Sequence, residues 1–154
     1  VRPLEKVAED ECFSADARQQ AQSEIRRLRS AEWKPMALVQ HGDMWLGNIL
    51  LPPRAARGSR ARKFVVIDWA GATLRGYPFY DLLRLGMECR LDANRLRGEV
   101  DAHCRIVGCA RGDVLGYLLG ALGHLGMNLE HFPRDRYARM ADRLLSYAKT
   151  VLPA

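Results

Sequence analysis

The chain has 154 residues, 48% of them hydrophobic, and a formal net charge of +6. This length suits a single domain, residues 1–154, with one sizeable core. Five positive charges fall between Arg54 and Lys63, a segment without acids or aromatic residues, which leaves the rest nearly neutral and argues against a nucleic-acid-binding protein. Because the N-terminus does not read as a secretion signal, we expect a cytoplasmic protein.

The first half of the chain predicts one helix and a small amount of β-structure. Residues 16–31 place alanine and aliphatic side chains at helical spacing, and Ser14 is a suitable N-cap. Residues 36–40 form a short apolar run that we interpret as a buried strand. The apolar runs 49–51 and 64–67 fit a small β-hairpin, and the glycine- and arginine-rich segment between them suggests a long solvated turn.

The second half is predicted to be helical. Apolar residues recur at helical spacing in four segments, which are residues 79–90, 94–107, 113–130 and 134–152. The stretch 114–129 is the most apolar, but a membrane span needs about 20 predominantly apolar residues, so we interpret it as a buried core helix. Together these elements predict an α+β domain dominated by helix.

The four cysteines are Cys12, Cys89, Cys104 and Cys109, and no two of them form a C-x-x-C pair. In a reducing compartment this spacing indicates free and mostly buried thiols rather than a disulfide framework or a metal site. The basic segment from Arg54 to Lys63 is interpreted as a solvated loop, with an acidic partner as the alternative.

Polar residues interrupt the apolar runs at two places. The segment from His41 to Asn48 reads H-G-D-M-W-L-G-N and spaces Asp43 and Asn48 five residues apart, whereas Asp68 follows the apolar run 65–67 directly. Phosphoryl transfer from ATP needs an aligned acceptor oxygen and a metal ion that neutralises the phosphate charge. A carboxylate can orient the acceptor hydroxyl and take its proton, and amide and carboxylate oxygens suit Mg²⁺.

The H-x-D-x-x-x-x-N segment resembles the catalytic loop of eukaryotic-type kinases, and Asp68-Trp69 resembles the start of their D-F-G motif. The H-G-D spelling is similar to that of the aminoglycoside phosphotransferase and choline kinase superfamily. The stretch from Gly76 to Leu82 also resembles the start of the next helix in that superfamily. The motifs cover residues 36–85 of the chain.

The resemblance implies a kinase-like C-terminal lobe whose small β-hairpin carries the catalytic loop. It implies that Asp43 is the catalytic base, that Asn48 and Asp68 bind Mg²⁺ and thereby ATP, and that His41 and Asp81 support the loop. The implied function is ATP-dependent phosphorylation of a hydroxyl group on a small molecule.

Two features depart from the family pattern. Trp45 stands where protein kinases place a lysine that contacts the transferred phosphate, which argues against a protein kinase. No glycine-rich phosphate loop with a strand lysine precedes residue 36. We therefore expect that the N-terminal nucleotide-binding lobe is absent from these residues and that the 154-residue chain alone is inactive.

Two alternatives remain open. A metal-dependent phosphoesterase would use His41, Asp43 and Asp68 as metal ligands, although such sites need more ligands. A non-catalytic kinase-like module would instead bind a partner. For the acceptor, residues 79–154 contain nine acids and eleven bases, which favours a neutral or anionic hydroxyl compound over a polycationic aminoglycoside.

Overall fold

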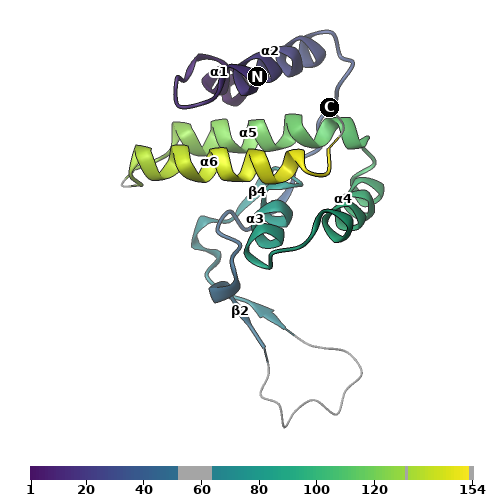
Figure 1. Cartoon of the computed structure of the whole chain (residues 1–154), viewed down its shortest axis with the longest axis vertical. Coiled ribbons are helices and arrows are strands. Elements are labelled where there is room, and N and C mark those ends of the chain that lie inside the picture. The colour runs from purple at the N-terminus through teal and green to yellow at the C-terminus, as the bar shows by residue number, and fades with distance from the viewer. Residues whose placement is uncertain (52–63, 131, 153–154) are drawn as a thin grey trace.

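The computed structural model describes residues 1–51, 64–130 and 132–152, and these are arranged as a mainly helical α+β domain (Figure 1). This confirms the prediction of an α+β domain dominated by helix. The basic segment from Arg54 to Lys63, with the expected solvated turn, lies outside the described residues.

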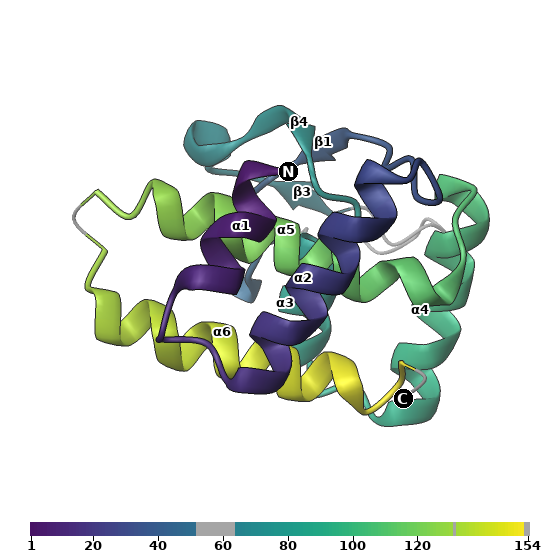
Figure 2. The ribbon, with the colours of Figure 1, turned by 90° about the horizontal axis from the view of Figure 1, so that it is seen from above.

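Two N-terminal helices lie across the C-terminal helices when the molecule is seen from above (Figure 2). Helix α2 (Ala15–Arg29) matches the predicted helix, and its Ser14 cap accepts a hydrogen bond from the Ala17 N–H at 3.2 Å. Helix α1 (Arg2–Glu9) was not predicted. It has only eight residues, which is too short for a convincing periodic pattern, and its apolar face is stabilised by packing on α5 and α2.

Helix α5 (Val114–Met127) forms the centre of the core, and α6 (Arg134–Lys149) packs beside it. Nine residues of α5 are buried, which confirms the predicted core helix. The Tyr137 hydroxyl of α6 donates to the Leu122 carbonyl oxygen at 2.8 Å. Helices α3 (Tyr80–Glu88) and α4 (Ala93–Val107) complete the helical part, close to their predicted bounds.

In the part of the chain that the structure describes, the β-structure consists of two separate antiparallel pairs. Strands β2 (Ile49–Leu50) and β3 (Val65–Val66) form the predicted hairpin, with Ile49 opposite Val66. Strand β1 (Leu38–Gln40) pairs with β4 (Thr73–Gly76), which was not predicted. The strand expected within residues 36–40 is present at Leu38–Gln40. The expectation that it is buried was wrong, because the Val39 side chain is 62% exposed.

Within the described ranges, three 3₁₀ turns connect these elements, namely η1 (Leu46–Asn48), η3 (Trp69–Gly71) and η4 (Arg111–Asp113). All four cysteines are free, as predicted, but only Cys104 is buried and Cys89 is exposed. The expectation of mostly buried thiols was therefore wrong, because three of them lie in or beside surface turns.

No single helix among residues 1–51, 64–130 and 132–152 has both the length and the apolar character of a bilayer span. Only segments 93–107 and 111–127 reach that composition together, and they are bent by 98°.

Helix α1 approaches α5 so closely that Gly123 has no room for a side chain. A Cβ there would lie 1.8 Å from the Pro3 carbonyl oxygen, whereas a Cβ on exposed Gly98 in α4 would contact nothing within 4 Å. We predict that Gly123→Ala lowers the free energy of unfolding by about 1–3 kcal/mol through overpacking. The control Gly98→Ala should raise it by about 0.5–1 kcal/mol. Urea unfolding measures both, and equal effects would contradict this packing.

Asp10 links the turn after α1 to α6. It is 6% exposed and accepts hydrogen bonds from the Cys12 N–H at 3.0 Å and from Arg134 at 2.7 Å, and Lys6 lies 3.0 Å away. Burial alone would raise the pKa of Asp10, but the Cys12 N–H and the Lys6 and Arg134 cations together hold the pKa well below its usual range.

We predict that the stabilisation from Asp10 is complete above its unfolded pKa of about 4 and is lost as the pH falls further, because the carboxylate must then be protonated. Asp10→Asn should lower the free energy of unfolding by roughly 1–3 kcal/mol at neutral pH and by much less at acidic pH. Urea unfolding at several pH values measures this, with exposed Asp142→Asn as the control. A pH-independent difference between Asp10→Asn and the wild type would contradict the prediction.

Candidate active site

His41 anchors the loop that follows β1. Its side chain is buried, Nε2 lies 2.8 Å from the Ile67 carbonyl oxygen, and Nδ1 lies 3.3 Å from the Asp43 backbone nitrogen. The neutral tautomer with the proton on Nε2 satisfies both contacts, since Nε2 then donates and Nδ1 accepts. The ring also packs edge-on against Trp69, with centroids 4.8 Å apart. His41 thus connects the loop to the end of β3.

Asp81 lies in the first turn of α3, and its carboxylate accepts hydrogen bonds from the backbone of the same loop. One carboxylate oxygen accepts the His41 N–H at 2.5 Å, and the other accepts the Gly42 N–H at 3.0 Å. Burial raises the pKa of Asp81, and the two N–H groups oppose that rise. The carboxylate therefore fixes the direction in which the chain leaves β1.

Gly42 allows the two polar segments to meet. Its φ is +83°, and a Cβ at this position would lie 2.9 Å from the Gly71 carbonyl oxygen. A side chain would be strained in this backbone conformation and would also collide with η3. The loop starting at His41 and the turn after Asp68 are consequently in direct contact.

Asp43 and Asn48 lie side by side. The Asn48 side chain is buried, and its Nδ2 donates to the Asp43 carbonyl oxygen at 2.9 Å and lies 3.4 Å from Asp43 Oδ2. Because the amide nitrogen faces Asp43, the Asn48 Oδ1 remains available as a ligand. The Asp43 side chain is 60% exposed, so its carboxylate is open to a substrate.

Asp68 stands at the end of β3, where the backbone turns into η3. The Ile67 N–H donates a hydrogen bond to the Asn48 carbonyl oxygen at 3.0 Å. Asp68, the next residue in the chain, is thereby placed beside the loop that carries Asn48. Asp68 has φ 60° and ψ 62°, its side chain makes no capping hydrogen bond, and it is exposed. This left-handed conformation is uncommon for a residue other than glycine, although Asp adopts it more readily than most residues.

Hydrogen bonds connect four of the five predicted site residues around the loop. The fifth, Asp68, is placed next to them along the chain, because the preceding Ile67 is hydrogen-bonded to both His41 and Asn48. In the described part of the chain, no three or more His, Cys, Asp and Glu side chains are arranged to hold a metal ion. Both ring nitrogens of His41 are engaged, which argues against a phosphoesterase that uses this histidine as a metal ligand. Asn48 and Asp68 offer two hard oxygen ligands of the kind that Mg²⁺ combines with water and phosphate.

Sequence reasoning missed Arg84 of α3. One of its terminal nitrogens lies 3.9 Å from Asp43 Oδ1, and its side chain is 18% exposed. Its position three residues after Asp81 was the available signal, because such residues share one face of a helix. That signal depended on knowing that Asp81 faces the loop.

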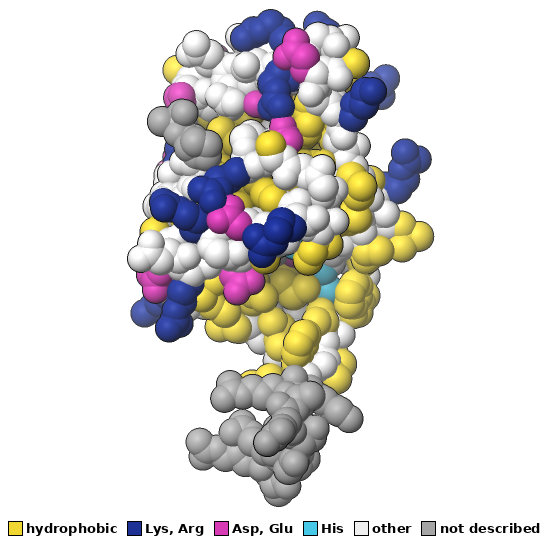
Figure 3. Space-filling model, turned by 90° about the vertical axis from the view of Figure 1, so that its right-hand side faces the viewer, with side chains coloured by type: hydrophobic (Ala, Val, Ile, Leu, Met, Phe, Trp, Pro, Cys, Tyr) yellow, Lys and Arg dark blue, Asp and Glu magenta, His cyan; other side chains and the backbone are white. Residues whose placement is uncertain are grey.

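Apolar side chains are exposed on the hairpin and beside the site. In Figure 3 apolar side chains gather in the lower part of the described surface, whereas most charged side chains lie over its upper part. The exposed members in the site loops and hairpin are Trp45, Leu46, Leu50, Leu51, Phe64, Val65, Ile67 and Trp69. This patch borders the loops that carry Asp43 and Asp68.

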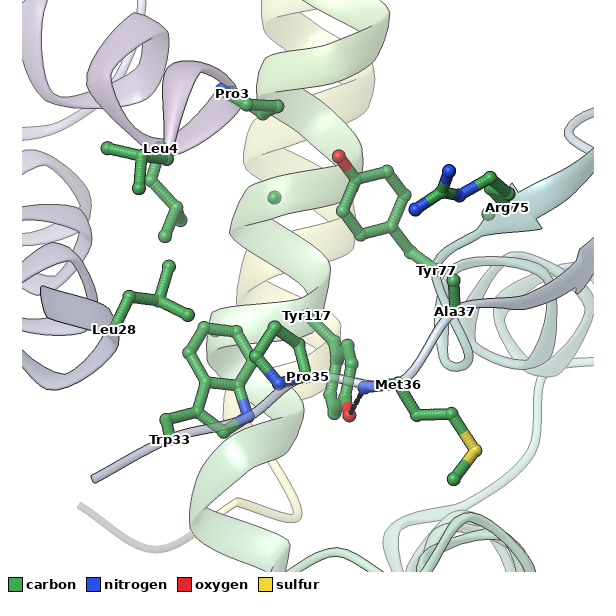
Figure 4. Close-up of a pocket in the computed structure, with 14 residues that line it drawn as sticks. Pro3, Leu4, Leu28, Trp33, Pro35, Met36, Ala37, Arg75, Tyr77 and Tyr117 are labelled. Atoms are coloured by element: carbon green, nitrogen blue, oxygen red, sulfur yellow. Dashed lines mark hydrogen bonds between the residues drawn. The ribbon is translucent and has the colours of Figure 1, made fainter. Parts of the chain in front are cut away.

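A separate cavity of about 240 Å³ lies between α1, α5 and β4 (Figure 4). Its walls include Leu4, Trp33, Tyr77 and Tyr117, and the Arg75 guanidinium extends toward the Tyr77 ring. None of the five predicted site residues lines this cavity. It is therefore distinct from the candidate active site.

Comparisons with protein-family models, with curated proteins and with solved structures found no match to this chain.

Proposed function

We propose that this chain is the catalytic lobe, of the kinase-like C-terminal type, of an ATP- and Mg²⁺-dependent phosphotransferase that acts on a hydroxyl group of a small molecule. One observation carries the proposal. Asp43 is an exposed carboxylate on a loop whose backbone is held by half-buried Asp81 and by buried His41, and its neighbour Asn48 is hydrogen-bonded to the residue before Asp68.

Asp43 suits the role of the base that aligns the acceptor. Its carboxylate is exposed, yet the loop below it is fixed at both the His41 and Gly42 amides. A hydroxyl that donates a hydrogen bond to Asp43 would be oriented for in-line attack, and its proton would pass to the carboxylate as the new bond forms. Fixing the carboxylate in advance lowers the entropic part of the barrier.

Asn48 and Asp68 fit a magnesium ion in their chemistry. Asn48 turns its Nδ2 toward Asp43 and leaves Oδ1 available, and Asp68 presents a carboxylate outside any capping hydrogen bond. These two residues would hold the ion, which when bound neutralises charge on the phosphates. The hydrogen bond from the Ile67 N–H to the Asn48 carbonyl oxygen would keep Asn48 and Asp68 at a constant separation.

The surroundings of Asp43 favour a neutral or anionic acceptor. The charged side chain within ion-pair distance of Asp43 in the described residues is a cation, Arg84, and exposed Trp45 and Trp69 lie in the two site loops. A polycationic aminoglycoside would require carboxylates around the acceptor. We therefore propose a neutral or anionic hydroxyl compound, such as a sugar.

A non-catalytic partner-binding module is the second candidate, because the exposed apolar patch on the hairpin is typical of an interaction surface. The two candidates differ in what Asp43 does. In a binding module, removing one exposed carboxylate at the edge of the patch should change little.

We predict that Asp43→Asn lowers acceptor phosphorylation by about 10²- to 10⁴-fold, because the amide cannot accept the hydroxyl proton. The measurement is transfer of labelled phosphate from ATP to a panel of hydroxyl compounds. The protein should be expressed from its complete reading frame, because these residues contain no glycine-rich phosphate loop before residue 36.

Exposed Asp142 provides a matched control, since Asp142→Asn makes the same chemical change far from the loop in the sequence. It should leave phosphorylation unchanged. If no acceptor is phosphorylated, or if Asp43→Asn retains full activity, the proposed phosphotransferase is wrong and the binding module is favoured.

For the metal, we predict that sub-stoichiometric Mn²⁺, used as a paramagnetic substitute for Mg²⁺, first broadens the NMR amide signals of residues 43–48 and 68–71. Asp68→Asn should abolish this selectivity, because it removes the charged ligand. The control Asp142→Asn should preserve it. Uniform broadening across the surface carboxylates would show that Asn48 and Asp68 do not form a metal site.

A further inference from the structure

We propose that Arg84 is the positioning residue of the active site, which holds the Asp43 carboxylate in its working orientation. This inference rests on the proposed function and adds to it a residue outside the recognised motifs. It also identifies a cation beside Asp43 in a site where Trp45 replaces the lysine expected of a protein kinase.

The first argument is the position of Arg84 on α3. Asp81 and Arg84 are three residues apart and therefore lie on one face of the helix. Asp81 binds the backbone of the loop at His41 and Gly42, and Arg84 reaches the side chain of the next residue, Asp43. One helix face thus controls both the path of the loop and the direction of its carboxylate.

The second argument is the geometry around the carboxylate. A terminal nitrogen of Arg84 lies 3.9 Å from Asp43 Oδ1, whereas Asn48 Nδ2 lies 3.4 Å from Asp43 Oδ2. Each oxygen therefore faces a different donor, and rotation of the carboxylate would weaken both interactions. These separations exceed ordinary hydrogen-bond lengths, and catalytic contacts often shorten only when substrate binds.

The third argument is burial. The Arg84 side chain is 18% exposed and that of Asp43 is 60% exposed, so the guanidinium lies on the protein side of the carboxylate. From there it can orient Asp43 but is poorly placed to contact a phosphoryl group in solvent. The role is therefore positioning rather than direct charge stabilisation.

The fourth argument is that, among the described residues, the Arg84 guanidinium has only part of its hydrogen-bonding groups occupied. Its Nε is buried and has no hydrogen-bond partner. Within the described residues, Asp43 is the one carboxylate in ion-pair distance of its guanidinium. Burial raises the pKa of the adjacent Tyr80, so that phenol stays neutral and cannot replace Asp43. A partly buried cation is favoured by a nearby counter-ion, which links the positions of the two side chains.

The test compares Arg84→Gln, Arg84→Lys and Arg84→Ala in the protein expressed from its complete reading frame, with ATP and the best acceptor as substrates. Arg84→Gln should lower kcat by about 10- to 100-fold, the effect of misplacing a reacting group by about 1 Å. The KM for MgATP should change by less than about twofold, because Arg84 acts on Asp43 and not on the nucleotide, so that nucleotide binding is unaffected. Arg84→Lys should retain more activity than Arg84→Gln.

Chemical rescue separates positioning from a merely structural role. Added methylguanidinium should restore part of the activity of Arg84→Ala, because the ion can occupy the vacated site beside Asp43. The control Arg97→Gln changes an exposed arginine of α4 and should match the wild type with or without the ion. Thermal unfolding of each variant verifies that the fold is retained.

The inference is overturned if Arg84→Gln is as active as Arg97→Gln, or if methylguanidinium gives no rescue of Arg84→Ala. It is also overturned if the loss is entirely in the KM for MgATP. Loss of activity in Asp43→Asn together with full activity in Arg84→Gln would reject only the role of Arg84. Full activity in Asp43→Asn would instead reject the proposed function itself.

Discussion

The Asp81 carboxylate accepts hydrogen bonds from two backbone N–H groups of the loop, one at each oxygen. Burying a carboxylate is unfavourable unless hydrogen bonds compensate, so α3 and the loop stabilise each other. Helix α3 in turn packs on α6 and α5, and Leu83 is fully buried. The helical core thereby determines where the Asp43 carboxylate lies, although Asp43 itself belongs to an exposed loop.

The hairpin depends on the same network. A two-stranded antiparallel pair is marginally stable in water by itself, and β2 and β3 have only two residues each. The Ile67 carbonyl oxygen accepts from the His41 ring, and the Ile67 N–H donates to Asn48. These two bonds at a single residue connect the hairpin to the loop and fix the start of the turn that carries Asp68.

The sequence predicted those features that depend on local pattern. Apolar spacing located α2 to α6, and the His41 to Asn48 segment located the polar loop. It did not predict the pairing of β1 with β4, because register between distant strands depends on tertiary packing. It also missed Arg84, since a helical side chain can be assigned to a site only when the rotation of its helix is known. The left-handed backbone of Asp68 similarly depends on contacts across the hairpin.

The pattern of burial within the loop differs from that of an ordinary turn. In a turn, polar side chains usually serve their own backbone and remain in solvent. Here His41 and Asn48 are buried and bond to distant or neighbouring backbone, whereas Asp43 and Asp68 remain exposed. The buried polar groups fix the frame and the exposed carboxylates project from it. This division would supply the preorganisation that the proposed chemistry at Asp43 requires.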